Sequence, residues 1–492
     1  MSSIRLTPDQ VQRCLHGVGY EIFVQSFFDS NSDGIGDLNG LRQKLDYLSD
    51  LGITLIWLMP IHPAKTYHKY DVEDYLTVHP DYGTLDDFRH LITECHQRGI
   101  LVVLDLVANH TSYDHPWFRQ AQLDSTNSYR DYYIWKDSER VIKLGVRAFD
   151  TSDINAAGLW HNVETSTITT QSSKLSTNTY YAIFDPRMPD LNYDCERVQD
   201  EICRIGQTWL ELGVDGFRLD AAKYFYKPSH LKSNISWWTK FRHAVSQINP
   251  SVYLIGEVWD LSNQIAPYLR SLDSVFNFEL ADLLISSILN EGNGSSLLNA
   301  YIRIMNIYQR ETNRQVLDAI FLSNHDQNRV MSVFNNNLSK GKLAAALLLT
   351  LPGLPFIYYG EEIGMLGMKP HDKYRREPFL CNGCVPLDQQ LIDPNSLVNH
   401  YKKLIQTRCQ SDVLLFGLLK PVATRIRSLC LFEREYNGKS VLIAHNLGHR
   451  MQRIPIPDNY YQIIFPTNND NQSITNKQVN LQGFSTIIIE SN

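Results

Sequence analysis

Short hydrophobic runs alternate with longer segments of helical hydrophobic spacing between Gly19 and Tyr359. The runs end at glycine, proline or polar residues, which is typical of buried strands. Segments between them, such as Leu38–Leu51 and Leu85–Gln97, have the spacing of helices that bury one face. The predicted strands are Gly19–Ser26, Ile53–Pro60, Ile100–Asp105, Gly213–Ala222, Val252–Val258, Val275–Phe278, Ala319–Leu322 and Pro355–Tyr359. Strands that alternate with helices about eight times predict an α/β fold, a parallel (β/α)8 TIM barrel.

Two parts of the chain depart from this alternation. Residues 110–189 contain a Ser/Thr-rich span, and a loop of that length is unusual inside a compact domain, so a small irregular domain is predicted after the third strand. Residues 396–492 contain short alternating runs separated by Asn, Gly and Pro clusters, which predict a C-terminal antiparallel, sandwich-like β domain. The barrel is therefore assigned to residues 1–109 and 190–395.

Composition and charge exclude several classes of partner. The net charge of −7 and the lack of a basic block argue against nucleic acid. The longest apolar run, Leu343–Tyr359, is broken by two prolines and a glycine, so it predicts a helix, a turn and a strand and not a membrane span. Met1–Gln10 lacks the apolar core of a secretory signal, and a cytoplasmic location is expected. Cys381 and Cys384 have no second pair at zinc-finger spacing, so reduced thiols are expected. The oligomeric state is left open.

The loop after the first strand carries oxygen atoms at alternate positions. Asp29, Asn31 and Asp33 are followed by Asp37, and the Ile35 carbonyl could supply a backbone ligand. This spacing resembles the start of an EF-hand loop, and calcium prefers oxygen ligands. A turn without an ion is the alternative, but its acidic side chains would repel one another. The sequence therefore predicts one structural Ca²⁺ site, and no calcium sensor, because the second helix of an EF-hand is missing.

Several predicted strands end in an acidic residue with a histidine, arginine or tryptophan nearby. The carboxyl ends of parallel barrel strands share one rim, so these side chains are expected to lie close together. They are Asp105 with Asn109 and His110, Arg218 with Asp220, Glu257, and His325 with Asp326. A single Arg–Asp pair could equally be structural. Two carboxyl groups beside a glycosidic bond can cleave it, and this is the simplest chemistry for the whole set.

Four segments, in chain order, resemble the four sequence blocks of the α-amylase family of glycoside hydrolases. They are Asp-Leu-Val-Ala-Asn-His (105–110), Gly-Phe-Arg-Leu-Asp-Ala-Ala (216–222), Gly-Glu-Val-Trp (256–259) and Phe-Leu-Ser-Asn-His-Asp-Gln-Asn-Arg (321–329). The resemblance runs from about Gly19 to Glu377, and the loop from Asp29 resembles the calcium loop of several branches. The C-terminal part resembles the family's β domain only in its position along the chain and in its pattern of short alternating runs.

The resemblance implies a role for each member of the acidic set. Asp220 is expected to be the nucleophile that forms a covalent glycosyl-enzyme, and Glu257 the general acid and then base. Asp326 is expected to hold sugar hydroxyls and stabilise the oxocarbenium-like transition state. Arg218 should keep Asp220 ionised. Glu257 should stay protonated, because the valine and tryptophan that follow it are apolar.

Substrate contacts are implied by the same resemblance. His110 and His325 are expected to donate hydrogen bonds to sugar hydroxyls, and Tyr70 to stack under the sugar ring. Lys223 and Tyr224 are expected to line the leaving-group side.

Departures within the resembling segments narrow the substrate. Ala221 after the nucleophile favours α-1,4 bonds, and residues 188–192 resemble the branch between oligo-1,6-glucosidases and neopullulanases. Tyr67 stands where exo-acting glucosidases carry an aspartate that closes the pocket, which favours endo cleavage. Lys69 replaces the usual glycine before the stacking tyrosine, with no evident effect on the cleft. The expected substrate is starch, glycogen or a maltooligosaccharide.

Two alternatives remain open at this stage. One is a glucosyltransferase, or a sucrose- or oligosaccharide-acting α-glucosidase, that shares the covalent intermediate. The other is an inactive barrel used as a binding subunit. The second is disfavoured because all three acidic residues are present.

Overall fold

The computed structural model describes residues 6–135, 159–163, 179–226, 228–379, 385–465 and 474–491. Their contacts form two compact units. The first comprises Met1–Met59, His90–Val103 and Trp259–Asn492, and the second comprises Pro60–Arg89 and Leu104–Val258. This division differs from the three predicted domains, whose boundaries stay predictions. The predicted thiol pair, Cys381 and Cys384, lies outside the described residues.

Eight strands form the predicted parallel barrel sheet, in the order β8-β7-β6-β3-β2-β1-β10-β9. Their bounds are β1 Gly19–Ile22, β2 Leu55–Leu58, β3 Leu101–Leu106, β6 Gly216–Leu219, β7 Tyr253–Gly256, β8 Ser274–Val275, β9 Ala319–Phe321 and β10 Leu354–Tyr358. A parallel bridge from Phe276 to Ala319 joins the two ends of this order. Every residue of these strands is buried, as expected where a parallel sheet is covered on both faces. The prediction of a (β/α)8 barrel is confirmed.

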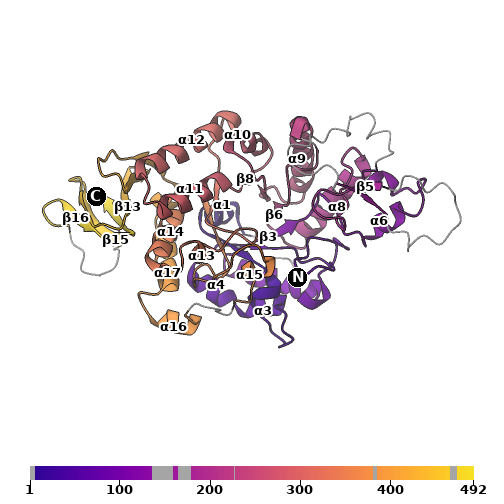
Figure 1. Ribbon diagram of the computed structural model, residues 1–492, viewed down its shortest axis with the longest axis horizontal. Helices are drawn as coiled ribbons and strands as arrows, with labels where there is room; N and C mark the ends of the chain where they lie inside the picture. The colour runs from indigo at the N-terminus through magenta and orange to yellow at the C-terminus, as the bar shows by residue number, and fades with distance from the viewer. Residues whose placement is uncertain are drawn as a thin grey trace. The chain divides into compact units, whose positions relative to one another are not determined.

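The helices separate the barrel strands along the chain (Figure 1). The α-helices are α1 Pro8–His16, α2 Val24–Phe27, α3 Leu38–Gln43, α4 Leu45–Leu51, α5 Leu85–Gln97, α6 Pro116–Ala121, α8 Glu196–Glu211, α9 Leu231–Ser246, α10 Ser262–Ile265, α11 Phe278–Leu289, α12 Gly294–Thr312, α13 Val330–Val333, α14 Leu338–Thr350, α15 Asp372–Arg375, α16 Leu387–Ile392, α17 Leu397–Gln410 and α18 Asp412–Phe416. The 3-10 helices are η1 Pro80–Tyr82, η2 Arg130–Tyr132, η6 Pro228–His230 and η7 Ala266–Arg270. Within the part of the chain that the structure describes, none of these helices combines the length and apolarity needed to cross a membrane.

Three predicted elements differ from those observed. The first predicted strand ends early, because its last residues form α2. The predicted helix Leu38–Leu51 is two helices, α3 and α4, separated at Lys44 by a non-helical backbone (φ −101°, ψ 1°). The predicted strand Val275–Phe278 is shorter, since Phe278 already begins α11, which Asn277 caps by accepting from the Leu280 N–H. Each hydrophobic run was real; a side-chain cap marks the change of structure at Asn277, whereas α2 and α4 begin without one.

The inserted segment contains a small antiparallel pair, β4 Trp160–Asn162 and β5 Thr179–Tyr181. Aromatic rings form its core: Phe118 lies 5.7 Å from the ring of Trp135 and 4.9 Å from that of Tyr180. Most of the Ser/Thr-rich span falls outside the described residues. Aromatic packing therefore stabilises the described part of the inserted segment.

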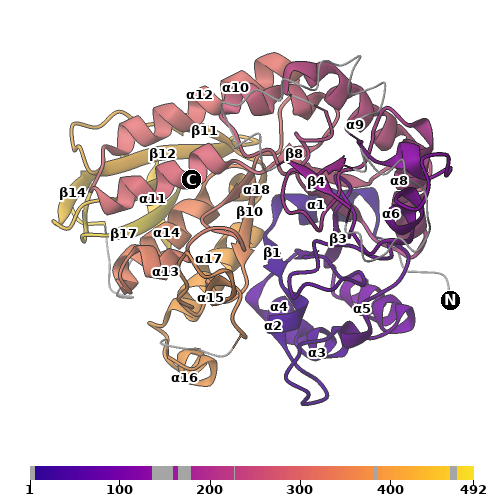
Figure 2. The ribbon, with the colours of Figure 1, turned by 45° about the vertical axis from the view of Figure 1, so that its right-hand side comes forward.

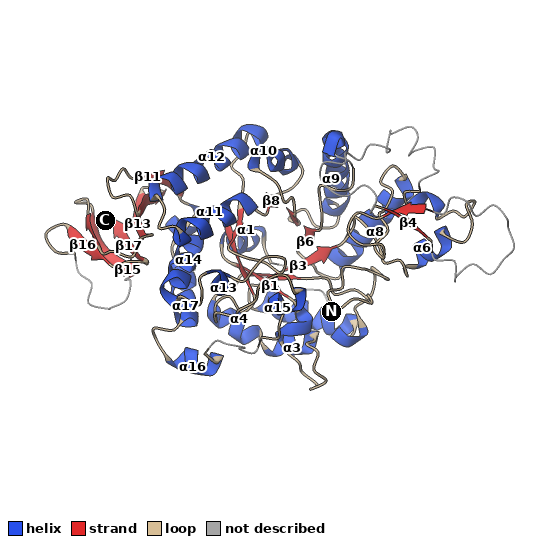
Figure 3. Ribbon diagram, in the orientation of Figure 1, coloured by secondary structure: helices blue, strands red, loops and turns tan. Residues whose placement is uncertain are grey.

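The C-terminal residues form the predicted antiparallel β structure (Figure 3). Its five-stranded sheet has the order β11-β12-β13-β17-β15, and β14 pairs with β16. Bounds are β11 Leu418–Pro421, β12 Leu429–Tyr436, β13 Lys439–Asn446, β14 Gln452–Pro455, β15 Tyr460–Phe465, β16 Gln478–Leu481 and β17 Ser485–Ser491. Residues of both sheets, including Leu442, Ile454 and Leu481, share one hydrophobic core.

Two buried arginines connect these strands to the helices beside them. Arg408 of α17 donates to the carbonyls of Leu349 and Leu351 at 3.0 Å, and Arg434 of β12 donates to the Thr350 carbonyl at 2.8 Å. These carbonyls lie at the C-terminal end of α14, where no intrahelical partner exists. Burial lowers the pKa of Arg408 to about 10 and that of Arg434 to about 9. Both guanidiniums thus cap one helix end from two directions.

Helix α12 and strand β12 also lie in close contact (Figure 2). A Cβ atom on Gly294, the first residue of α12, would lie 2.3 Å from the Cys430 backbone nitrogen. The N–H of Gly294 also donates to the Arg427 carbonyl at 2.9 Å. Only glycine permits this approach.

Candidate active site

Arg218 lies at the centre of a group of three carboxylates in the second unit. Its Nη1 atom is 3.0 Å from both side-chain oxygens of Asp105 and 2.6 Å from Oδ1 of Asp220. Its Nη2 atom is 2.9 Å from Oε1 of Glu257. Asp105 follows four buried residues of β3, whereas Asp220 and Glu257 come directly after the ends of β6 and β7. The predicted convergence of strand-end carboxylates is therefore observed for these three residues.

The charge on Arg218 is maintained by its neighbours. Burial acts to lower its pKa, but Asp105, then Glu257, Tyr70 and Asp220, raise it well above its usual value. The guanidinium is 1% exposed, so its interactions are little screened by water. A permanently charged, planar group can contact several carboxylates in fixed directions.

Backbone contacts hold Asp220 and Glu257 side by side. The Glu257 N–H donates to the Leu219 carbonyl, and the Ala222 N–H donates to the Glu257 carbonyl, each at 3.0 Å. A Cβ atom on Gly216 would lie 2.1 Å from the Tyr253 carbonyl oxygen, so glycine is required for this approach of β6 to β7. The two carboxylates consequently flank one guanidinium.

The surroundings of Glu257 differ from those predicted. Ala221 adopts a left-handed backbone (φ 48°), and its N–H donates to Oε2 of Glu257 at 3.1 Å. Together with Arg218, this polar donor stabilises an ionised carboxylate. Trp259, which was expected to supply an apolar wall, is 43% exposed and stacks on Phe278 with ring centroids 4.5 Å apart. The apolar residues that follow Glu257 in the sequence are therefore not its only surroundings, and its protonated state stays a prediction.

Tyr70 is held beside the carboxylates. Its hydroxyl donates to Oδ2 of Asp105 at 3.3 Å, and its ring centroid lies 5.9 Å from the Arg218 guanidinium carbon. Nε2 of His110 is 3.2 Å from the Tyr70 carbonyl. Burial lowers the pKa of His110 to about 4, so at neutral pH the ring is neutral and donates from Nε2 to that carbonyl. In this structure His110 therefore holds the backbone of Tyr70.

Phe184, near this group, was not identified from the sequence, whereas Lys223 and Tyr224 were. Phe184 is 48% exposed, and its ring lies 5.4 Å from that of His110 and 5.3 Å from that of Tyr224. Lys223 places its Nζ atom 5.2 Å from the Tyr224 ring centroid. Nothing in the segment around Phe184 marks it as more than a core residue, so only its exposure indicates a role in binding a ring.

His325 and Asp326 belong to a second polar group, in the first unit. Nδ1 of His325 is 2.5 Å from Oε1 of Glu21, and Nε2 is 3.4 Å from Oδ2 of Asp326. Arg376 contacts Oδ1 of Asp326 at 2.9 Å through Nη2. Burial acts to lower the pKa of His325, but Asp326 and Glu21 raise it overall. Sequence reasoning missed Glu21 and Arg376, which lie outside the segment that contains Asp326.

The predicted calcium loop lies in the first unit, and its contacts are mainly with its own backbone. Asp29 accepts from the Gly34 N–H at 2.8 Å, and Asp33 accepts from the Ile35 N–H at 2.8 Å. The carboxylate of Asp37 caps α3 through the Gly40 N–H at 2.7 Å. Among the described residues, no three acidic, histidine or cysteine side chains gather as a metal site. The oxygen atoms suit calcium, but these contacts also describe the alternative of a turn without an ion.

Comparison with known proteins gives the family. The model described as "Alpha amylase, catalytic domain" matches residues 21–384, and one described as "Alpha-amylase SusG C-terminal domain" matches residues 429–488. The chain belongs to the α-amylase family. It is an α-amylase-type glycosidase or transferase with a (β/α)8 barrel, and family membership implies an α-glucan substrate.

Relatives of this α-amylase-family chain include hydrolases and a transferase. Alpha-amylase 3 of Dictyoglomus thermophilum is 42% identical over 453 residues, covering 88% of this chain and 85% of the relative. A 4-alpha-glucanotransferase of Thermotoga neapolitana is 35% identical, covering 88% and 96%. The crystal structure of an α-amylase from H.orenii has a TM-score of 0.85 and 37% identity, covering 97% and 100%.

Replacing Arg218 by lysine should lower kcat/KM by at least about 100-fold, because an ammonium cannot contact three carboxylates in fixed directions. Initial rates on a soluble glucan measure this loss. The control is Arg204→Lys on the surface of α8, where Arg204 pairs with Glu201 of the same helix. Equal rates for the wild type and the Arg218→Lys variant would contradict a central role for the guanidinium.

His325→Gln should change the pH dependence of stability. The pKa of His325 is raised above 6.5, so its interaction with Glu21 adds stability that is complete below that pH and is lost as pH rises through the folded-state value. Urea unfolding from about pH 5 to 9 should show the variant losing most stability at the acidic end. A constant difference between the two proteins across this range would refute the assignment.

Proposed function

We propose that the chain is a retaining, endo-acting hydrolase of α-1,4-glucosidic bonds in starch, glycogen or maltooligosaccharides. The observation that carries the proposal is the contact of Asp220 and Glu257 with one guanidinium. Retaining glycosidases use two carboxyl groups about 5–5.5 Å apart, and inverting enzymes use pairs about 6.5–9.5 Å apart. Two carboxylates held on one planar group favour the closer arrangement.

Each carboxyl group then has a distinct task. Asp220 attacks the anomeric carbon of the sugar while Glu257 donates a proton to the leaving glycosidic oxygen, giving a covalent glycosyl-enzyme. Glu257 then removes a proton from the water that attacks this intermediate. To donate, Glu257 must first be protonated and leave its contact with Arg218. Arg218 retains Asp105 and Asp220, which keeps the nucleophile ionised.

The substrate-facing residues keep their proposed roles. Tyr70 stacks under the sugar ring at the bond that is cleaved, and Lys223 lines the leaving-group side. Asp326 and His325 bind hydroxyls and stabilise the positive charge that develops on the sugar. Arg376, which contacts Asp326, fixes the direction of that carboxylate. Tyr67 stands where exo-acting glucosidases carry an aspartate that closes the pocket, and this supports endo cleavage.

A glucanotransferase is the second candidate. It is favoured by the 35% identical relative named 4-alpha-glucanotransferase, which covers 88% of this chain. Hydrolysis and transfer share the covalent intermediate. They differ in whether water or another sugar attacks that intermediate.

Asp220→Asn should lower turnover of maltoheptaose by at least about 1000-fold, because an amide cannot act as the nucleophile. Chromatography of the wild-type products at early times tests the rest of the proposal. Endo hydrolysis gives several chain lengths and new reducing ends, whereas transfer gives longer chains without a net gain of reducing ends. Asp200→Asn, an exposed aspartate on α8, is the matched control and should keep full activity. Wild-type rates for Asp220→Asn would disprove the nucleophile assignment.

We also propose that the loop of Asp29, Asn31, Asp33, Ile35 and Asp37 holds one structural Ca²⁺. Support comes from its oxygen-rich donor set, which matches the preference of calcium. Chelation by EDTA should lower the melting temperature by several degrees, since a ligand that binds only the folded state stabilises it. Asp33→Ala should abolish this shift, whereas Asp9→Ala, an exposed aspartate in α1, should retain it. If EDTA does not change the melting temperature of the wild type, the loop is a turn without an ion.

A further inference from the structure

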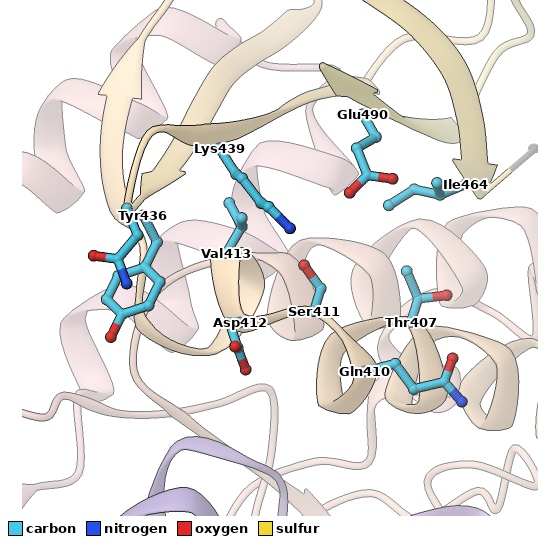
Figure 4. A pocket seen from close by; sticks show the side chains of 10 residues that line it. Thr407, Gln410, Ser411, Asp412, Val413, Tyr436, Lys439, Ile464 and Glu490 are labelled. Carbon is cyan, nitrogen blue, oxygen red and sulfur yellow. The ribbon is translucent and has the colours of Figure 1, made fainter. Parts of the chain in front are cut away.

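A hollow of about 510 Å³ lies between the α17–α18 junction and the end of the five-stranded sheet (Figure 4). The helical side contributes Thr407 and Gln410, and the hairpin between β12 and β13 contributes Tyr436 and Lys439. Glu490 enters from β17. The hollow lies wholly within the first unit and contains none of the residues assigned above to catalysis.

Several polar side chains of this hollow are available to a ligand. Within the described ranges, the side chains of Gln410, Tyr436, Lys439 and Glu490 make no hydrogen bond or ion pair with another residue. Asp412 is already neutralised, because its Oδ1 lies 3.0 Å from Nη1 of Arg13. One positive and one negative charge remain, so the hollow favours neither an anion nor a cation.

The walls of the hollow are fixed in place. The Tyr436 ring packs on Phe416 with centroids 5.6 Å apart, yet the residue is 36% exposed. The hairpin turns through Asn437 and Gly438, whose φ angles of 50° and 79° suit a tight two-residue turn. In β12, two residues before Tyr436, Arg434 donates to the Leu414 and Gly417 carbonyls and so ties this strand to α18. A rigid aromatic face beside free donors and acceptors costs little entropy on binding.

We infer that this hollow is a second carbohydrate-binding site, which takes a segment of α-glucan. Sugars are neutral, present hydroxyls that both donate and accept, and stack their C–H faces on aromatic rings. The lining offers an amide, an ammonium, a carboxylate and a tyrosine, and its volume falls within the usual range for small-ligand pockets of about 300–1,000 Å³. The glucan identity of the ligand rests on the proposed function.

Native gel electrophoresis in amylopectin tests the site, with Asp220→Asn as the background to prevent hydrolysis. Adding Tyr436→Ala and Lys439→Ala should weaken the retardation about tenfold, the loss expected for a stacking contact and a hydrogen bond. Tyr461→Ala is the matched control, because Tyr461 is an exposed tyrosine (53%) of β15 that does not line the hollow. In the wild-type background, Tyr436→Ala should leave turnover of maltotriose unchanged. Unfolding midpoints equal to the parent's verify that the variants fold.

Two results would overturn the inference: retardation that Tyr436→Ala and Lys439→Ala leave unchanged, and a parent protein that amylopectin does not retard. The proposed function has a separate readout. If the wild type hydrolyses glucans but the variant is retarded like its parent, only the second site is refuted. If retardation depends on Tyr436 but the wild type neither cleaves nor transfers glucans, the binding site stands and the proposed activity fails.

Discussion

A single buried guanidinium organises the candidate active site. Three carboxylates contact Arg218, and a buried carboxylate without a cation would take up a proton instead of remaining charged. The barrel supplies the geometry by ending β6 and β7 in register, so Asp220 and Glu257 reach the same arginine. Asp105 completes the group from β3. Because its nitrogens are fixed in one plane, the guanidinium sets the directions of both carboxylates and keeps the proposed nucleophile ionised.

Local backbone conformation is the second requirement of the site. Ala221 and Lys69 both adopt left-handed backbones, at φ 48° and 64°, immediately after Asp220 and immediately before Tyr70. The sequence resemblance leads us to expect glycine at position 69, and the positive φ of Lys69 is a backbone conformation that glycine adopts readily. Its buried side chain places Nζ 5.4 Å from the Tyr82 ring centroid. Burial also lowers the pKa of Lys69, so its ammonium is destabilised relative to one in water.

The C-terminal strands are connected to their helices by polar contacts as well as by a hydrophobic core. Arg408 and Arg434 donate to carbonyls at the C-terminal end of α14, and His445 places Nε2 3.0 Å from the Thr350 hydroxyl. Burial lowers the pKa of His445 to about 3, which keeps it neutral. Arg434 also donates to the Leu414 and Gly417 carbonyls, so it fixes α18 beside β12 at the proposed second sugar site. One side chain thus contributes both to the capping of α14 and to the wall of that site.

The sequence by itself determined the barrel, the antiparallel C-terminal strands and the family, because hydrophobic periodicity and short strand-end motifs are local properties. It also identified Asp220 and Glu257, which follow directly from the ends of their strands. Only the tertiary structure decided what each side chain contacts. Glu21 joins His325 and Arg376 joins Asp326 from distant parts of the chain, Arg218 contacts Glu257, and His110 holds Tyr70. Such contacts depend on proximity in three dimensions, which cannot be predicted from the spacing of residues along the chain.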